Sequence, residues 1–302
     1  IFGTDRIFKI SGSSSSDFVV TPVTRKIGCV DGKSIQELGG DLIYLAPDGL
    51  RSIAGTERIG DVELGTVSKQ IQDRISDIGT NNITSTIIRS KSQYRLFYPS
   101  TNETETNAKG IIAVLKANPE TGTLGFEYAD LKGIKPSCTD SFFVGDTETI
   151  VHGGYDGYVY KQESGGSFTR AGATHTITGF YRSPDMSLGD PGIRKSMQRV
   201  LVNYKVGEAI DTTNQTFSLR YNYDDTNTPQ PSPYEFSSAT VAAFYGSGVY
   251  ATSAYGSSGF PLERVSVEGS GFVVAFKLED ESTKKSLSLR GFELEYVNGG
   301  RR

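Results

Sequence analysis

The chain has 302 residues and a net charge of −4, with 17 basic and 21 acidic residues before residue 165 and 14 of each after it. Neither half therefore has the basic surface typical of proteins that bind nucleic acid through its phosphates. No apolar run approaches the roughly 20 residues that a membrane-spanning helix needs. Glycine, tyrosine and phenylalanine are abundant, at 35, 16 and 16 residues, which favours many strands and turns.

The first half of the chain consists of short runs in which apolar and polar residues alternate. Clusters of Gly, Pro, Asn and Asp separate these runs, as they do between the strands of an antiparallel sheet. The predicted strands cover residues 17–28, 41–46, 49–54, 82–90, 93–99, 110–117, 122–129, 140–146 and 158–163. The first half is therefore predicted to be all-β apart from one segment.

That segment is "ELGTVSKQIQDRISDIG", residues 63–79. Its apolar residues fall at steps of three and four, and Gly79 follows as a stop signal, so it is predicted to be the one helix. The opposite face has mixed charges, including Lys69 and Arg74. We expect these two residues to lie at an assembly surface.

Three stretches share a turn built on aspartate: "IFGTDRIFKISG" with Asp5, "LIYLAPDGLRSIAG" with Asp48 and "TIVHGGYDGYVYKQE" with Asp156. Gly49 and Gly157 follow the last two, and Asp-Gly is a common way to reach positive φ in a tight hairpin. The aspartates are 43 and 108 residues apart, about one and two steps of the same period. A period of roughly 40–50 residues is typical of β-propeller blades.

Residues 1–165 are therefore predicted to form a partial β-propeller of about three and a half blades. The chain begins at Ile1, inside the first of the aspartate-turn stretches and without an initiator Met, which suggests that blade material from a longer polypeptide precedes it. We expect the N-terminal part that would close the ring to be missing from this chain.

After the glycine-rich stretch 165–172, the predicted strands become longer and more regular. They cover residues 173–183, 195–206, 215–225, 261–269, 271–280 and 286–297. Such a series predicts an antiparallel β-sandwich domain over residues 166–302.

Within this second domain, residues 224–259 are rich in Gly, Ser, Pro and Tyr and predict a long loop. Its tyrosines, Tyr245 and Tyr250 among them, either contribute to a subunit contact or a sugar-binding platform, or pack on their own domain. We place Tyr245 and Tyr250 at an assembly surface.

Residue types that perform chemistry are few. His152 and His175 are the only histidines, and neither lies in a zinc-binding or catalytic-triad pattern. Cys29 and Cys138 show no paired spacing, so we expect two reduced, buried thiols. Without a nucleotide-binding motif as well, the sequence predicts no enzymatic activity, no cofactor and no metal site.

One pair of carboxylates could provide glycosidase chemistry, because glycosidases require only two carboxyl groups. Asp185 and Asp190 lie in one loop, "SPDMSLGDPG". They either form turns, which we favour, or bind calcium or lie near a sugar. In the favoured interpretation they belong to the assembly surface.

The order of these pieces resembles the tail nozzle proteins of short-tailed bacteriophages, also described as tail tube or DNA-stabilisation proteins. The phrases "YLAPDGLRSI" and "SLGDPGIRKSMQRVLV" and the terminal "GGRR" contribute most to the resemblance, which covers most of the chain. It implies a structural virion component that forms a hexameric tube, retains the packaged DNA and conducts it during ejection.

The resemblance also implies partners and a location. The partners would be further copies of the chain, the tail adaptor, tail fibre or spike proteins, the host cell surface, and double-stranded DNA that passes without sequence-specific binding. The protein would assemble in the host cytoplasm and reside in the virion tail. The alternatives are a receptor-binding or glycan-depolymerising tail protein with a β-propeller, and a cellular propeller scaffold.

Overall fold

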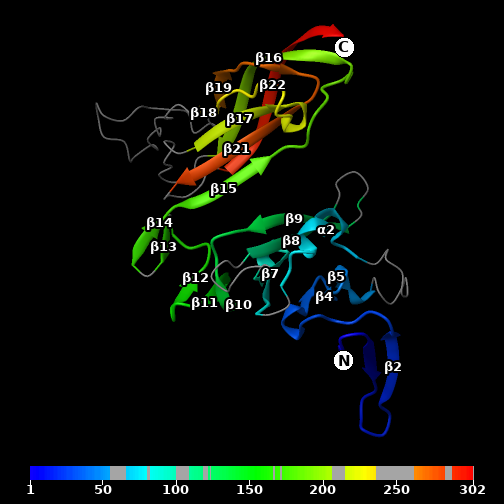
Figure 1. The fold of residues 1–302 in the computed structure, drawn as a ribbon. Helices are drawn as coiled ribbons and strands as arrows, with labels where there is room; N and C mark the ends of the chain where they lie inside the picture. The colour runs from blue at the N-terminus through cyan, green and yellow to red at the C-terminus, as the bar shows by residue number, and fades with distance from the viewer. Residues whose placement is uncertain are drawn as a thin grey trace. The chain divides into compact units, whose positions relative to one another are not determined.

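The computed structural model describes residues 1–54, 66–79, 82–99, 109–117, 122, 124–165, 167–170, 172–205, 215–235, 262–282 and 288–301. The chain divides into two compact units, unit 1 at Ile1–Ser164 and unit 2 at Gly165–Arg302, next to the sequence-based boundary at 165/166. Both units are built from antiparallel sheets, so the predicted all-β class is confirmed (Figure 1). Within the described ranges, no helix is long and apolar enough to cross a bilayer.

In the part of unit 1 that the structure describes there are four antiparallel sheets, each made of strands that follow one another in the chain. The first two sheets are β1 (Ile7–Ser11) with β2 (Val19–Thr24), and β3 (Gln36–Leu38) with β4 (Asp41–Ala46) and β5 (Gly49–Ser52). The third sheet consists of β6 (Thr84–Ile88), β7 (Gln93–Tyr98), β8 (Lys109–Ala117) and β9 (Leu124–Leu131). The fourth consists of β10 (Pro136–Val144), β11 (Thr147–Gly154) and β12 (Val159–Lys161). Among the strands described here, the third sheet alone has the four-stranded up-and-down order of a propeller blade.

The main core of unit 1 lies between the β3–β5 and β6–β9 sheets. Leu45 and Leu50 from the first sheet pack with Ile87, Leu96 and Ile111 from the second, all of them buried. The strands predicted over residues 110–117 and 122–129 are present as the antiparallel pair β8–β9. Every residue of β6 is buried, so this strand is covered on both faces, whereas in β9 the half-buried Phe126 and Tyr128 alternate with exposed residues and one face is covered.

The predicted helix over 63–79 is wrong in length. The structure has a 3-10 turn η3 (Lys69–Ile71) followed by the single α-turn α2 (Gln72–Ile75), while residues 63–65 lie outside the described ranges. Ile75 and Ile78 do face the core, as the spacing predicted. Two buried isoleucines on a short turn satisfy the apolar pattern, so a longer helix is not required.

Gly49 begins β5 directly after the two loop residues Pro47 and Asp48, because Ala46 pairs with Gly49 across the turn. Its φ is +138°, and a Cβ there would lie 2.4 Å from Ser68 Oγ. That hydroxyl accepts a hydrogen bond from Leu50 N at 3.0 Å. The glycine is therefore required both by the backbone conformation and by the contact with Ser68.

We expect Gly49→Ala to lower the free energy of unfolding of unit 1 by about 2 kcal/mol, because the strained backbone and the displaced Ser68 both add cost. Urea unfolding followed by circular dichroism measures this. Gly125→Ala is the control, since no atom lies within 4 Å of its added Cβ. Equal stability of the two variants would contradict the conclusion that position 49 requires glycine.

The described residues of unit 2 form two four-stranded antiparallel sheets and a small hairpin. The hairpin pairs β13 (Phe168–Arg170) with β14 (Ala173–His175). The first sheet has the order β15 (Ile177–Arg182), β21 (Val274–Ser282), β17 (Gln215–Tyr221), β18 (Tyr234–Glu235). In the second, β16 (Ile193–Lys205) pairs with β19 (Leu262–Ser266), β20 (Ser270–Gly271) and β22 (Ser288–Arg301).

The core of unit 2 lies between these two sheets. Phe276 of β21 stacks on Phe292 of β22, with ring centroids 4.4 Å apart, and so joins one sheet to the other. Val200 and Val202 of β16 are fully buried in the same cluster. Two antiparallel sheets around one apolar core form a sandwich-like unit, as the sequence predicted.

Candidate functional site

One face of the β1–β2 hairpin consists entirely of apolar residues. Ile10 pairs with Val20 and Phe8 with Pro22, and Phe18 continues the same alternation. Ile10 is 49% exposed and Val20 is 58% exposed. We call these five residues the hairpin face.

The hairpin is anchored at its base and ordered at its tip. Ile7 is buried with Cys29 and Tyr44, and Val23 packs against the same cluster. At the tip, Asp17 accepts hydrogen bonds from Ser14 N at 2.6 Å and from Ser13 N at 3.1 Å, which lower the pKa of Asp17 to about 2. The hairpin face lies between these two ordered ends (blue in Figure 1).

A second outward surface lies on the β10–β12 sheet. Phe142 and Val144 of β10 share a face with Val151 of β11 and Val159 of β12, as the strand register shows. Phe142 is 45% exposed and Val159 is 77% exposed. We call these four residues the sheet face. Because exposed apolar groups of this kind mark interaction sites, both faces are candidates.

The opposite side of the β10–β12 sheet packs on the β6–β9 sheet. Ser141 Oγ donates a hydrogen bond to the carbonyl of Ile87, and Ile150 is buried. The carboxylate of Glu148 accepts hydrogen bonds from the backbone N–H groups of Arg89, at 2.9 Å, and Ser90, at 2.8 Å, in the 3-10 turn η4 (Arg89–Lys91). The sheet face is therefore held on a fixed support.

An ion-pair cluster just beyond β12 also fixes this sheet. Glu163 binds both Lys91 and the buried guanidinium of Arg95, whose Nη1 donates to Gln162 Oε1 at 3.0 Å. The imidazole of His152 bonds to Gln162 Nε2 at 3.2 Å. Burial raises the pKa of Glu163, but the hydrogen bonds from Lys91 and Arg95 outweigh it, so the pKa lies below its ordinary value of 4.5.

We expect Glu163→Gln to destabilise unit 1 by about 2 kcal/mol near neutral pH, because Arg95 would keep its charge without its carboxylate. Wild-type Glu163 contributes stability above its unfolded-state pKa and loses it as pH falls through the lowered folded-state pKa. The difference between variant and wild type should therefore vanish well below pH 4.5. Urea unfolding at several pH values measures it.

Glu127→Gln is the control for this series, since its pair with Lys116 has both side chains exposed and should change stability by less than about 0.5 kcal/mol. A pH-independent loss in Glu163→Gln would contradict the role of the charge.

The three turn aspartates have different surroundings. Asp5 pairs with Arg6 at 2.7 Å, and both side chains are exposed. Asp48 instead binds Arg51, with Nη2–Oδ2 at 2.5 Å and Nε–Oδ1 at 3.0 Å, and the Arg51 side chain is only 1% exposed. This buried cation could not be predicted from the sequence, because an arginine in an alternating strand is normally on the solvent side.

Asp156 lies in the turn between β11 and β12 and accepts a hydrogen bond from Tyr160 OH at 2.8 Å. The next residue, Gly157, has a φ of +84°. Tyr160 in turn stacks on His152, with ring centroids 5.1 Å apart. The turn is therefore linked to the polar cluster beneath the sheet face.

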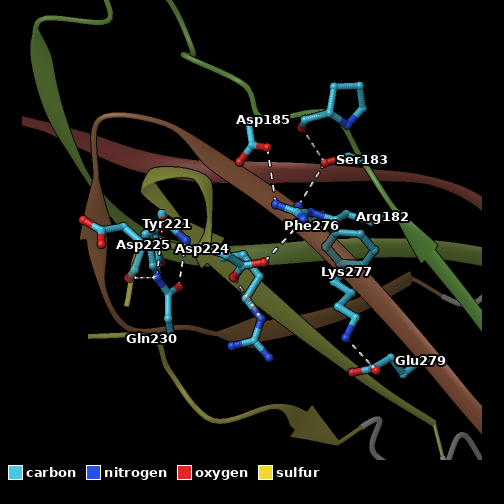
Figure 2. A network of polar contacts seen from close by, with 12 residues as sticks. Arg182, Ser183, Asp185, Tyr221, Asp224, Asp225, Gln230, Phe276, Lys277 and Glu279 are labelled. Atoms are coloured by element: carbon cyan, nitrogen blue, oxygen red, sulfur yellow. Dashed lines mark hydrogen bonds and ion pairs between the residues drawn. The ribbon is translucent and has the colours of Figure 1, made fainter. Parts of the chain in front are cut away.

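The second half of the chain contains the polar network in Figure 2. Arg182 at the end of β15 lies between Asp185, at 3.3 Å, and Asp224, at 3.4 Å. Asn222, Tyr223 and Asp224 all have left-handed φ, of 52°, 62° and 61°. Asn222 stabilises this turn by accepting a hydrogen bond from Phe272 N at 2.9 Å. Sequence reasoning missed the turn, although Asn and Asp tolerate this conformation better than most residues.

Asp190 stabilises the turn in which it lies. Its Oδ1 accepts a hydrogen bond from Gly192 N at 2.7 Å, and its backbone carbonyl accepts one from the buried Lys195. Asp185 and Asp190 thus bind different groups. Among the described residues, no three His, Cys, Asp or Glu side chains form a group able to hold a metal ion.

The other predicted surface residues are dispersed. Lys69 is exposed, and Arg74 pairs with Asp130 of β9 at 3.2 Å. Tyr245 and Tyr250 lie outside the described residues. The two cysteines are free, but Cys138 is exposed on β10, so the expectation that both are buried is wrong for it. Cys138 lies at the protein surface because it shares the outward side of β10 with Phe142.

The chain is thus an all-β protein with a sandwich-like second unit and two outward apolar surfaces on the first. No family model matches it, and no curated protein matches it either.

Proposed function

We propose that this chain is a structural subunit of a short bacteriophage tail, whose oligomer forms a nozzle that retains packaged DNA and conducts it during ejection. The observation that supports it best is the pair of outward apolar faces on unit 1. A two-stranded hairpin with an exposed apolar face is only marginally stable by itself, so a neighbouring subunit would stabilise it.

The charge of the chain is compatible with this function. A channel for DNA must not hold the phosphates, and a wall rich in Lys and Arg would gain counterion-release free energy at every step. With a net charge of −4, this chain offers little of that attraction. The motifs that resemble those of tail nozzle proteins favour this kind of assembly over other oligomers.

Electron microscopy of virions labelled with an antibody against this chain tests the proposal, with label expected at the tip of the tail axis. Mass measurement of the purified chain with its tail adaptor should give a ring of identical subunits. A stable monomer under those conditions would overturn the proposal. Saturable binding of host polysaccharide, lost in Asp185 or Asp190 variants, would support a glycan-binding tail protein instead.

A further inference from the structure

The hairpin face and the sheet face lie at opposite ends of unit 1, with the β3–β5 and β6–β9 sheets between them (Figure 1). Each is a shallow apolar β surface. The hairpin is anchored at its base by Ile7 and Val23, and the sheet is anchored from behind by Ser141 and Glu148. Two such surfaces can pack as the layers of a β-sandwich do, at about 10 Å.

The surroundings of the two faces have opposite charge. Arg25 and Lys26 are exposed just beyond β2, at the base of the hairpin. Asp140 shares the outward side of β10 with Phe142, and Asp146 is exposed in the turn between β10 and β11. Lys161 lies on the same side of the sheet as Val151, so the acidic residues there outnumber the basic one by two to one.

We propose that the hairpin face of one copy binds the sheet face of the next copy, joining the subunits head to tail. The inference rests on the proposed function, because it names the contact between subunits of the nozzle. Opposite charge favours this pairing, whereas hairpin against hairpin or sheet against sheet would bring like charges together. A head-to-tail contact repeats from copy to copy and closes into a ring when the rotation permits.

The exposed thiol of Cys138, on the same side of β10 as Phe142, allows a direct test. Val20→Cys adds a second thiol on the hairpin face, while Cys29 is buried. A short bismaleimide should then link each copy to the next, giving a ladder of dimers, trimers and larger species on a denaturing gel. The unmodified chain, with Cys138 alone on the surface, should give no ladder.

Two variants serve as controls. Leu124→Cys places a thiol at an exposed apolar residue of β9, outside both faces, and should give no ladder. Val20→Cys with Cys138→Ser should also give none. Dimers from that double variant would show that hairpin meets hairpin and would overturn the proposal.

Charge reversal provides an independent readout. Arg25→Glu with Lys26→Glu, in the Val20→Cys chain, should reduce the ladder about tenfold through like-charge repulsion. Adding Asp140→Lys and Asp146→Lys should restore it. If each variant folds and the ladder is still not restored, the proposed pairing of the two faces is overturned.

The outcomes separate this inference from the proposed function. Rings seen by electron microscopy without a ladder from Val20→Cys would overturn the head-to-tail contact and leave the nozzle intact. A monomer with neither ring nor ladder, absent from the tail tip, would overturn both.

Discussion

Asp48→Ala is expected to destabilise unit 1 by about 3 kcal/mol, because it removes the carboxylate that neutralises a fully buried guanidinium. Arg51 is bound to Asp48 through two of its nitrogens, and Thr66 donates a further hydrogen bond to the same carboxylate at 3.0 Å. Burial raises the pKa of Asp48, but the hydrogen bonds from Arg51 outweigh it and lower the pKa below 3.8. The carboxylate is thus charged at neutral pH.

Asp5→Ala is the matched control, since Asp5 occupies a similar sequence motif but pairs with an exposed arginine. It should leave the free energy of unfolding nearly unchanged, because fully exposed ion pairs contribute little to stability. Urea unfolding of the two variants at neutral pH distinguishes them. Similar losses of stability in both variants would show that the aspartate stabilises the turn itself, and that its ion pair with the buried Arg51 is not the cause.

Phe276→Ala should destabilise unit 2 by about 3–5 kcal/mol, because it leaves a cavity where the two sheets meet. Phe276 is fully buried and stacks on Phe217 at 5.6 Å and Phe292 at 4.4 Å. Calorimetry should show the transition of unit 2 lowered by roughly 10 °C. The transition of unit 1 should not move, since its core is separate.

The control for this prediction is Phe180→Ala in β15, where the side chain is 55% exposed. Its effect should stay within about 0.5 kcal/mol, as for most exposed positions. If Phe276→Ala shifted both transitions equally, the two units would unfold together, contrary to their separate cores.

Local patterns predicted most strands well. Residues 93–99 and 110–117 were predicted as strands, and the structure has β7 at Gln93–Tyr98 and β8 at Lys109–Ala117. Alternation is a property of neighbouring residues, so it can be recognised without knowing the fold. Which strands pair could not be predicted in this way. The pairing of β16 with β22 joins residues about a hundred positions apart, and only the tertiary packing decides such a pairing.

The candidate site could be predicted only in part. A strand with one apolar face has the same sequence pattern whether that face meets its own core or another subunit. Ile10 and Phe142 were therefore not identified as surface residues until the fold placed them. The burial of Arg51 was missed for a related reason, since its partner Asp48 looks in the sequence like an ordinary turn residue.

The strand order of the two units has a consequence for how the chain folds. Every sheet of unit 1 joins consecutive strands, from β1–β2 to β10–β11–β12. In unit 2, β15 and β17 both pair with β21, and β16 pairs with β22. Local pairing needs little loop closure and is fast, whereas distant pairing is slow.

Unit 1 can therefore fold hairpin by hairpin while the ribosome is still synthesising the rest of the chain. Unit 2 must wait for β21 and β22, the last two strands described, before either of its sheets is complete. The order of synthesis thus gives each nascent chain a folded first unit, with both of its outward faces, while its second unit is still unfolded.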